Sequence, residues 1–380
     1  MRVAFFSTLT NTSWGGSEVL WFKTALHIQK SGIKVGVFVK KWETESLAIK
    51  LLREAGVEVF FYNNDQDINL SKRIIIKLKR LLFFEKNILG AVFKWNPDFI
   101  FFSQSHSYDL GYFTEKTVNT ILETVIPYCI ICQNNTDYSF VPENEVRGRI
   151  KKIYSKAKLV FFVSKRNKRT AENIVSNKIE NSVIISNSIS LSANEIGILP
   201  YPDDKVINFA CVARLRCSHK GQNLLLAVLS QSVWFKRPWI LNLYGNGEDE
   251  KYLKELVVYL NLTDRVNFKG QVSDIRAIWE ENHILLLPSF GEGMPLALQE
   301  AMLCGRSGVV TDVGGNSELI DDNVNGWISN GNTLISFNEA LERAWDNKIK
   351  WEKIGALAYE KAVSRIDLFP HETLLKYIFQ

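Results

Sequence analysis

Two glutamates are spaced so that they can hold a hydroxyl-rich, negatively charged ligand. Glu292 lies in the turn Gly-Glu-Gly-Met-Pro-Leu, and Glu300 follows in the helix that this turn is expected to begin near Pro295. An ionised carboxylate accepts hydrogen bonds from hydroxyl groups, while the unpaired N–H groups of a helix N-terminus attract an anion. The two carboxylates are therefore expected to bracket an anion site, unless they are an ordinary loop acid and a solvated helix acid.

Two cations follow an earlier strand of the same half. Arg214 and Lys220 lie in the loop between the apolar run Val206–Val212 and a helix expected to begin near Gln222. Loops at the carboxyl ends of parallel strands are where α/β sheets bind ligands. Arginine can clamp a phosphate with two hydrogen bonds and lysine supplies a point charge, so the pair predicts a diphosphate site. A solvated loop pair is the alternative.

These residues are carried by an alternation of short apolar strands and amphipathic helices, which is typical of parallel sheets covered by helices. The predicted strands of the first half are Val3–Ser7, Val35–Val39, Val57–Tyr62, Phe99–Ser103, Tyr128–Gln133, Leu159–Ser164 and Val183–Ser186. Those of the second half are Val206–Val212, Trp239–Tyr244, Val266–Lys269, Ile284–Pro288 and Gly308–Thr311. The polar stretch 188–205 between them suits a linker.

Length and composition fit this α/β organisation. The chain has 380 residues, 46% of them hydrophobic, and a formal net charge of +5; this suggests two soluble domains and excludes disordered and multi-spanning classes. Neither a membrane-spanning run nor the apolar core of a secretion signal is visible, so a cytoplasmic location is expected. Cys129 and Cys132 are three apart on a predicted strand and should point to opposite faces, which disfavours a redox or metal pair.

One basic amphipathic segment stands apart from its neighbours. Residues 71–95 combine seven cations with a single Glu85 and many aliphatic and aromatic residues. Such a stretch can lie on an anionic membrane surface, where each cation contributes about 1 kcal/mol. The alternative is a helix with a solvated basic face, so the segment leaves open whether the protein is peripheral on the inner face of the cell membrane.

At this point the chain resembles the retaining GT-B glycosyltransferases of glycosyltransferase family 4, the glycosyl transferases group 1. The resemblance rests on an ordered set of motifs: Arg214 with Lys220-Gly221, Leu243-Tyr-Gly-Asn-Gly247, Val266-Asn-Phe-Lys-Gly270, Glu292 with Glu300, Asp312-Val-Gly-Gly315, Asn325-Gly326, Gly15-Gly16-Ser17-Glu18 and Val163-Ser164-Lys165. It covers most of the chain and is strongest over residues 206–327.

The resemblance implies a role for each matching residue. Arg214 and Lys220 would bind the donor diphosphate, Glu292 the transferred sugar, and Glu300 the ribose hydroxyls. The other residues implied in donor binding are Gly15, Gly16, Gly245, Gly293, Met294, Pro295 and Leu296. The catalytic set would be Glu292, Arg214 and Lys220, and the family pattern implies no metal and no other cofactor.

The sequence departs from the family in the first half. Where many relatives carry a histidine, residues 131–137 read Ile-Cys-Gln-Asn-Asn-Thr-Asp, so Gln133 or Asn134 would have to hold the sugar. His106, after the strand Phe99–Ser103, is a further candidate for an acceptor or sugar contact, with an ordinary loop histidine as the alternative.

The implied fold is α/β, two Rossmann-like domains whose parallel sheets face across a cleft. The expected boundaries are an acceptor-side domain over 1–190, a linker over 191–205, a donor domain over 206–360, and a C-terminal helix over 361–380 that crosses back to the first domain. The implied reaction is retaining transfer of a hexose-type sugar, from a UDP-sugar rather than a GDP-sugar, to a glycan or lipid-linked glycan, as in surface polysaccharide assembly.

Three other functions remain open from the sequence. A nucleotide-sugar epimerase would share the architecture, and a sugar phosphorylase would need a pyridoxal cofactor and a longer chain. A non-catalytic nucleotide-sugar-binding module would not need Glu292, Arg214 and Lys220, all of which are present. Nucleic-acid binding would rest on the basic segment alone, without a reader motif, and is not expected.

Overall fold

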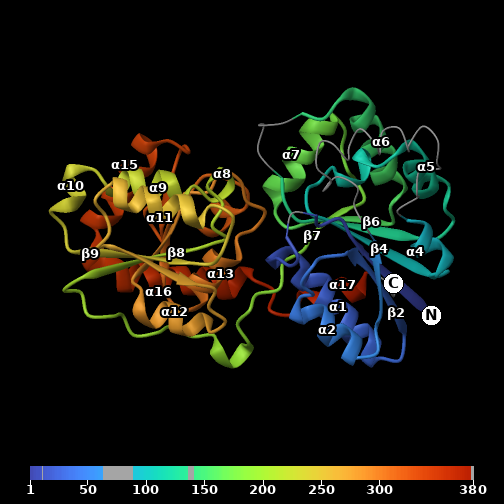
Figure 1. Cartoon of the computed structure of the whole chain (residues 1–380), viewed down its shortest axis with the longest axis horizontal. Coiled ribbons are helices and arrows are strands. Elements are labelled where there is room, and N and C mark those ends of the chain that lie inside the picture. Colours follow the sequence, from blue (N-terminus) through green and yellow to red (C-terminus); the bar gives the residue numbers. More distant parts are fainter. Residues whose placement is uncertain (11, 63–88, 136–140, 378–380) are drawn as a thin grey trace. The chain divides into compact units, whose positions relative to one another are not determined.

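The structure, a computed structural model, describes residues 1–10, 12–62, 89–135 and 141–377 (Figure 1). They form two compact units, each with its own core. Unit 1 consists of Met1–Ser188 and Phe369–Gln380, and unit 2 of Ile189–Leu368. Of the basic segment 71–95, residues 71–88 lie outside the described residues, so the predicted membrane surface is not tested there.

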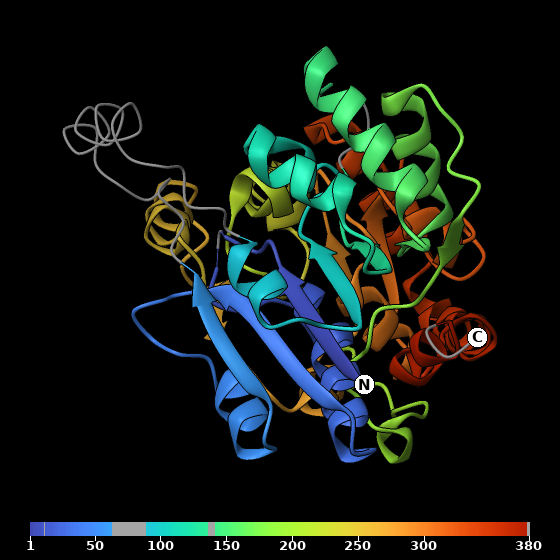
Figure 2. The ribbon, with the colours of Figure 1, turned by 90° about the vertical axis from the view of Figure 1, so that its right-hand side faces the viewer.

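Unit 1 is built on a parallel sheet. Its seven described strands follow the order β3-β2-β1-β4-β5-β6-β7. Their bounds are β1 Arg2–Ser7, β2 Lys34–Lys40, β3 Glu58–Tyr62, β4 Phe99–Gln104, β5 Tyr128–Cys132, β6 Leu159–Phe162 and β7 Ser182–Ile184. The central strands β1, β4 and β5 are almost entirely buried, which explains why they are continuous apolar runs rather than alternating ones. Figure 2 shows the strands side by side.

Helices cover both faces of this sheet. The helical segments described in unit 1 are η1 Gly16–Glu18, α1 Val19–Lys30, α2 Leu47–Glu54, α4 Gly90–Lys94, η3 Asp109–Tyr112, α5 Glu115–Glu123, α6 Asn144–Lys156, α7 Lys165–Val175 and α17 Pro370–Lys376. Helices α1, α2 and α17 pack on one core cluster and α4 to α7 on the other. Cys129 belongs to the first cluster and Cys132 to the second, so the two thiols lie on opposite faces, as predicted.

Unit 2 repeats the arrangement. Its parallel strands follow the order β10-β9-β8-β11-β12-β13, with bounds β8 Ile207–Val212, β9 Trp239–Tyr244, β10 Val266–Gly270, β11 Ile284–Leu287, β12 Ser307–Thr311 and β13 Trp327–Ser329. The three-residue β13 was not predicted because so short a run carries no alternation that separates a strand from a loop.

The sheet of unit 2 is also covered on both faces. Its helical segments are η4 Ala193–Glu195, α8 Cys217–Lys220, α9 Gln222–Leu229, α10 Ser232–Phe235, α11 Glu250–Tyr259, α12 Ile275–Glu281, α13 Leu296–Leu303, α14 Asn316–Leu319, α15 Leu334–Asp346, η5 Lys348–Lys350 and α16 Trp351–Arg365. Figure 1 shows α9, α11 and α15 on one face and α12, α13 and α16 on the other, and each set has its own apolar cluster.

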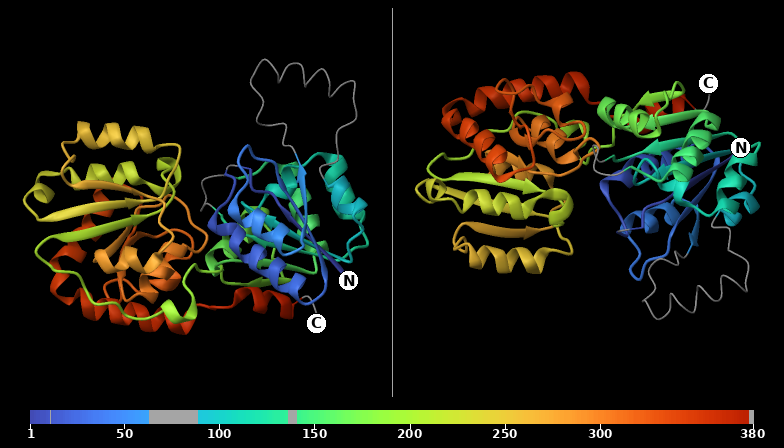
Figure 3. Two further views of the ribbon diagram at one scale, coloured as in Figure 1. Left: turned by 60° about the horizontal axis from the view of Figure 1, so that its bottom comes forward. Right: turned by 90° about the horizontal axis from the view of Figure 1, so that it is seen from above.

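The chain passes between the units at positions that differ from the expected linker and terminal boundaries. Residues 191–205 pack on unit 2, because Leu199 N–H donates to Cys304 O at 3.1 Å and the buried Arg306 donates to Leu199 O and Pro200 O. At the other end, α16 stays with unit 2 and α17 packs on α1 in unit 1 (Figure 3). Throughout the described ranges, no helix has the length and apolar character needed to cross a membrane.

Candidate functional site

The order of the strands in unit 2 indicates that a ligand would bind at the carboxyl ends of its central strands. β9 and β10 lie on one side of β8, and β11 to β13 lie on the other. In open α/β sheets ligands bind outside the carboxyl ends of the strands at such a reversal. Arg214 and Lys220 follow β8, and Glu292 follows β11, so the loops flanking the reversal carry the predicted cations and the first predicted acid.

Lys220 and Glu292 form an ion pair at the carboxyl ends of β8 and β11. Lys220 Nζ lies 2.6 Å from Glu292 Oε1, and Ser289 Oγ donates to the same oxygen at 2.6 Å. Both charged side chains are largely buried, and Glu292 is only 5% exposed. The two loops are also joined through their backbones, because Phe290 N–H donates to His219 O at 2.9 Å.

Gly221 explains how the loops come so close. It has a φ of +69°, and a Cβ there would lie 2.2 Å from Pro288 O. A side chain is excluded both by the left-handed backbone and by the neighbouring strand end. The Lys220-Gly221 pair thus combines the cation with the residue that lets it reach Glu292.

The turn that holds Glu292 leads directly into α13. The helix was predicted to begin near Pro295, but Pro295 is its N-cap, so α13 begins one residue later at Leu296, and it has no side-chain cap. Its first N–H groups therefore donate no hydrogen bond to a capping side chain. Such an end carries a partial positive charge suited to a phosphate or a sugar oxygen.

Glu300 lies one turn and a half into α13 and is 5% exposed. Its Oε1 accepts a hydrogen bond from Ser190 N–H at 2.8 Å. This contact orients the carboxylate, which retains further lone pairs for other donors. The sequence does not predict this hydrogen bond, because Ser190 and Glu300 are 110 residues apart along the chain.

Arg214 is held by an acid that the sequence analysis missed. Arg214 Nη2 lies 3.0 Å from Glu248 Oε2, and Arg216 Nε lies 3.2 Å from Glu248 Oε1. The predicted Gly245 lies next to this group, since a Cβ there would be 2.3 Å from Ala213 O. Glu248 directly follows the motif Leu243-Tyr-Gly-Asn-Gly247. This position beside a glycine turn was the one feature of the sequence that could have identified Glu248 as a site residue.

The remaining predicted residues belong to unit 1, whose sheet also reverses, between β1 and β4. Gly15 and Gly16 lie between β1 and α1, and the exposed His106 follows β4. His106 N–H donates to Asp109 Oδ2 at 3.0 Å, and Thr8 Oγ1 donates to the same oxygen at 2.5 Å. Burial raises the pKa of Asp109, and the nearby His106 lowers it.

Glu18, the last residue of the Gly-Gly-Ser-Glu turn, is a buried acid. It is 3% exposed, and Ser7 Oγ donates to its Oε2 at 2.6 Å. Burial raises its pKa to about 7, while the hydrogen bond from Ser7 lowers it. Near neutral pH the side chain therefore exists partly as a carboxylic acid, which can both donate and accept hydrogen bonds.

Gln133 and Asn134 follow β5. Gln133 is 4% exposed, and neither polar atom of its amide has a hydrogen-bond partner among the described residues. Asn134 contributes its backbone carbonyl, which accepts from Ser107 N–H at 3.1 Å. A buried amide without partners is unfavourable for folding, so Gln133 is the stronger of the two candidates for a ligand contact.

One group of side chains in the described ranges has the composition of a metal site, and it contains none of the predicted site residues. His27 on α1 and His371 and Glu372 on α17 place potential ligand atoms within 4.8 Å of one another. His27 and His371 rings are 5.6 Å apart and inclined at 61°.

Comparison with known proteins finds a family model that resembles a segment of the second half of the chain. Residues 207–347 match the family model described as glycosyl transferases group 1. The predicted resemblance is therefore confirmed over this segment, which contains Arg214, Lys220, Glu292 and Glu300.

Curated relatives match about a third of the chain. The chain is 32% identical over 131 residues to an uncharacterized glycosyltransferase of Haemophilus influenzae, covering 34% of this chain and 37% of the relative. It is 35% identical over 108 residues to the UDP-Gal:alpha-D-GlcNAc-diphosphoundecaprenol alpha-1,3-galactosyltransferase of Escherichia coli, covering 28% and 27%. The chain thus spans about a third of the length of the curated relatives that it matches.

Solved structures extend the likeness to the whole chain. Anabaena Alr3699/HepE in complex with UDP and glucose superposes with a TM-score of 0.70 at 18% identity, covering 100% of this chain and 99% of the other. The lipopolysaccharide outer core galactosyltransferase WaaB superposes with a TM-score of 0.69 at 18% identity and the same coverage. These matches confirm the predicted α/β fold with two parallel sheets.

Proposed function

From the match of residues 207–347 to the glycosyl transferases group 1, we propose that this protein is a retaining glycosyltransferase. It moves a hexose-type sugar from a UDP-sugar to a hydroxyl group of a glycan or lipid-linked glycan, as in surface polysaccharide assembly. UDP is favoured as the nucleotide because the names of the Escherichia coli relative and of the Anabaena complex include it. A diphosphoundecaprenol acceptor, named for the same relative, supports a lipid-linked acceptor here.

The observation that carries the proposal is the Lys220–Glu292 pair at the strand reversal, 2.6 Å apart and largely buried. A buried ion pair gains little for stability compared with apolar residues, so its position is better explained by a ligand. When a diphosphate arrives, Lys220 can turn its charge to the phosphate, which leaves Glu292 to accept a hydroxyl hydrogen of the sugar.

The neighbouring groups complete the donor site. Arg214 would bind the diphosphate as a bidentate clamp, and the N–H groups at the start of α13 would bind its oxygens. Glu300, oriented by Ser190, would accept the ribose hydroxyls. The positive groups would stabilise the charge that develops on the departing UDP.

The chemical step follows from these roles. The bond between the sugar anomeric carbon and the diphosphate oxygen breaks, and UDP leaves with the electron pair. The acceptor hydroxyl oxygen bonds to the oxocarbenium-like carbon on the face that UDP leaves. Its proton passes to the departing phosphate oxygen, so the products are UDP and a glycoside of unchanged anomeric configuration.

Calorimetric titration with UDP, UDP-glucose, UDP-galactose and GDP-mannose tests the donor assignment. We expect UDP and one UDP-sugar to bind, and Arg214→Gln to weaken UDP at least tenfold because a charge-assisted hydrogen bond contributes about 1.5–3 kcal/mol. Lys251→Gln is the matched control, because it also removes one positive charge and its side chain is 91% exposed. Absence of binding by any nucleotide sugar would contradict the proposal.

The reaction class is tested by product analysis. Incubation with the bound UDP-sugar and an acceptor should release UDP and form a glycoside that retains the anomeric configuration, measured by NMR. An epimerised nucleotide sugar would indicate an epimerase instead. Binding without any turnover, with or without acceptor, would indicate a non-catalytic module.

The proposal includes donor binding without a metal ion, because Arg214 and Lys220 supply positive charge next to the proposed diphosphate site. Excess EDTA is then expected to leave both UDP affinity and turnover unchanged. A loss of either that is restored by Mg²⁺ or Mn²⁺ would overturn this part of the proposal. The same titration tests whether the His27, His371 and Glu372 group affects activity.

A further inference from the structure

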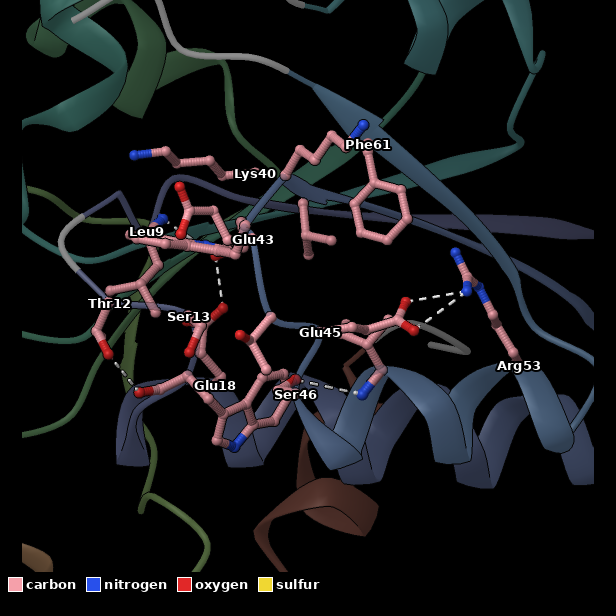
Figure 4. A pocket seen from close by; sticks show the side chains of 17 residues that line it. Leu9, Thr12, Ser13, Glu18, Lys40, Glu43, Glu45, Ser46, Arg53 and Phe61 are labelled. Carbon is pink, nitrogen blue, oxygen red and sulfur yellow. Dashed lines mark hydrogen bonds and ion pairs between the residues drawn. The ribbon is translucent and has the colours of Figure 1, made fainter. Parts of the chain in front are cut away.

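Unit 1 contains a cavity of about 250 Å³ at the carboxyl ends of β1, β2 and β3 (Figure 4). The segment after β1, the segment after β2 and the first turns of α2 line it. Its volume is below the roughly 300–1,000 Å³ of sites for drug-sized ligands, so it suits a single ring. None of the residues predicted as site residues from the sequence lines it.

Aromatic rings form much of its wall. Trp14, Trp42 and Phe61 line the cavity, and the guanidinium carbon of Arg53 lies 5.2 Å from the Phe61 ring centroid. The Trp14 ring packs edge-on against Trp21 at 5.6 Å, while the ammonium of Lys40 lies 4.2 Å from the Trp42 ring centroid. Supported rings of this kind offer flat apolar surfaces to the C–H groups of a ligand.

A buried polar group lies at the end of the cavity nearest β1. The carboxyl group of Glu18 lines it and is fixed by the 2.6 Å hydrogen bond from Ser7 Oγ. Because burial raises the pKa of Glu18 to about 7, this carboxyl group can exchange hydrogen bonds with a hydroxyl in either direction. Figure 4 shows Glu18 and Phe61 at different ends of the cavity.

The charged side chains of the lining balance each other. Three cations and three acids line the cavity: Lys40, Lys41, Arg53, Glu18, Glu43 and Glu45. Arg53 and Glu45 pair at 3.0 Å, and Lys40 Nζ donates to Thr10 O at 3.0 Å. The formal charges of these side chains balance, and the partial protonation of Glu18 near neutral pH leaves only a small positive excess, so the lining carries no strong net charge to favour a phosphate or a carboxylate over an uncharged ligand.

We propose that this cavity binds an uncharged pyranose ring of the acceptor, with Trp42 and Phe61 against its C–H faces and Glu18 on a hydroxyl group. The proposal rests on the proposed function, and it adds the place and the chemical class of the acceptor unit. A lipid chain is the less suitable occupant, because it could offer the buried Glu18 carboxyl no hydrogen bond to add to the one from Ser7.

Saturation-transfer NMR and calorimetry on the full chain with saturating UDP test this proposal. The probes are the methyl glycosides of glucose, galactose, mannose and N-acetylglucosamine, with glucose 6-phosphate and glucuronate as charged counterparts. We expect at least one methyl glycoside to bind, and to bind more tightly than either charged probe. Tighter binding of a charged probe, or no binding of any glycoside, would overturn the proposal.

Three variants locate the site. Trp42→Ala and Phe61→Ala are expected to weaken the bound glycoside at least tenfold, and Glu18→Gln to weaken it while the cavity keeps its shape. Tyr259→Ala is the matched control, since this tyrosine is 80% exposed and lies in unit 2. Unchanged glycoside affinity in both aromatic variants would contradict the assignment.

Measurement of UDP affinity in the same samples separates the two proposals. Trp42→Ala and Phe61→Ala should bind UDP as the wild-type protein does. If UDP binds normally and the glycoside result is negative, only this inference fails. If neither UDP nor any nucleotide sugar binds, the proposed function fails whatever the glycosides do.

Discussion

The ion pair between Lys220 and Glu292 joins the loops that follow β8 and β11. The variant Glu292→Gln tests whether Glu292 contributes to stability or to turnover. The amide oxygen of glutamine can still accept from Lys220 and Ser289, so the free energy of unfolding should change by no more than about 2 kcal/mol. Turnover should fall on the order of a hundredfold, because a preorganised group at the transferred sugar is lost. Wild-type-like turnover, measured by UDP release, would contradict the catalytic role.

Gln133 allows stability and activity to be separated at one position. Its buried amide has no partner among the described residues, so replacing it with methionine removes an unsatisfied polar group. We expect Gln133→Met to leave the melting temperature unchanged or raise it, and to lower transfer. A variant that loses stability and keeps its activity would show that Gln133 is a structural residue.

The buried carboxyl of Glu18 makes stability depend on pH. Its pKa is raised to about 7, above the value of 4.5 for an exposed glutamate, so the folded state binds more protons than the unfolded state between these values. Stability therefore falls as pH rises from about 4.5 to 7 and then levels off. Burial raises the pKa of Tyr62 on β3, and the charges of Glu18 and of Asp109 on η3 raise it further.

Glu18→Gln removes this dependence. Relative to the variant, the wild-type protein should lose on the order of 3 kcal/mol of unfolding free energy between pH 4.5 and pH 8. Urea denaturation at the two pH values measures the difference, and the comparison cancels the titration of Tyr62 and Asp109. Equal loss in both proteins would show that Glu18 is already ionised in the folded state at low pH.

Glycine turns between strands and helices determine how closely the loops of unit 2 approach. Gly221→Ala should destabilise by about 1–3 kcal/mol, because φ is +69° and the new Cβ would meet Pro288 O. Gly148→Ala is the matched control, since it lies within α6 with nothing within 4 Å and should stabilise by about 0.5–1 kcal/mol. Chemical denaturation measures both, and an equal response would contradict the packing argument.

The sequence predicted the elements of the donor half well because the information there is local. The apolar run Ile284–Leu287, the glycines around Glu292 and the proline before α13 lie within a few residues of one another, and each has a conformational meaning. What it missed depends on tertiary contacts. Neither the partnership of Ser190 with Glu300 nor that of Glu248 with Arg214 leaves a periodic signal.

The boundaries of the units were harder to predict for the same reason. Residues 191–205 are polar and proline-containing, which is typical of a linker, yet Leu191 and Leu199 are buried and Arg306 binds the backbone of this stretch. The composition of the stretch does not predict a hydrogen bond from an arginine about 100 residues further along the chain. The aromatic cavity of unit 1 was likewise missed, because its walls come from three separate segments.

Each unit of the molecule has its own cores, so we expect two unfolding transitions rather than one. UDP should raise only the transition of unit 2, which contains the proposed donor residues. Leu374→Ala in α17, fully buried in the core of unit 1, should lower only the other transition, with a cost of about 2–5 kcal/mol. Leu47→Ala, at a leucine that is 71% exposed, is the control; a single transition that moves with both UDP and Leu374→Ala would contradict independent unfolding.

Gly314 packs against the turn that holds Glu292, although it lies more than 20 residues further along the chain. It has a φ of +52°, and a Cβ there would lie 2.1 Å from Glu292 O; its neighbour Gly315 donates to Gly293 O at 2.8 Å. A library of random variants selected for sugar transfer would therefore keep glycine at 314 as strictly as glutamate at 292. Tolerance to mutation along this protein then maps the packing behind the turn as well as the groups that meet the substrate.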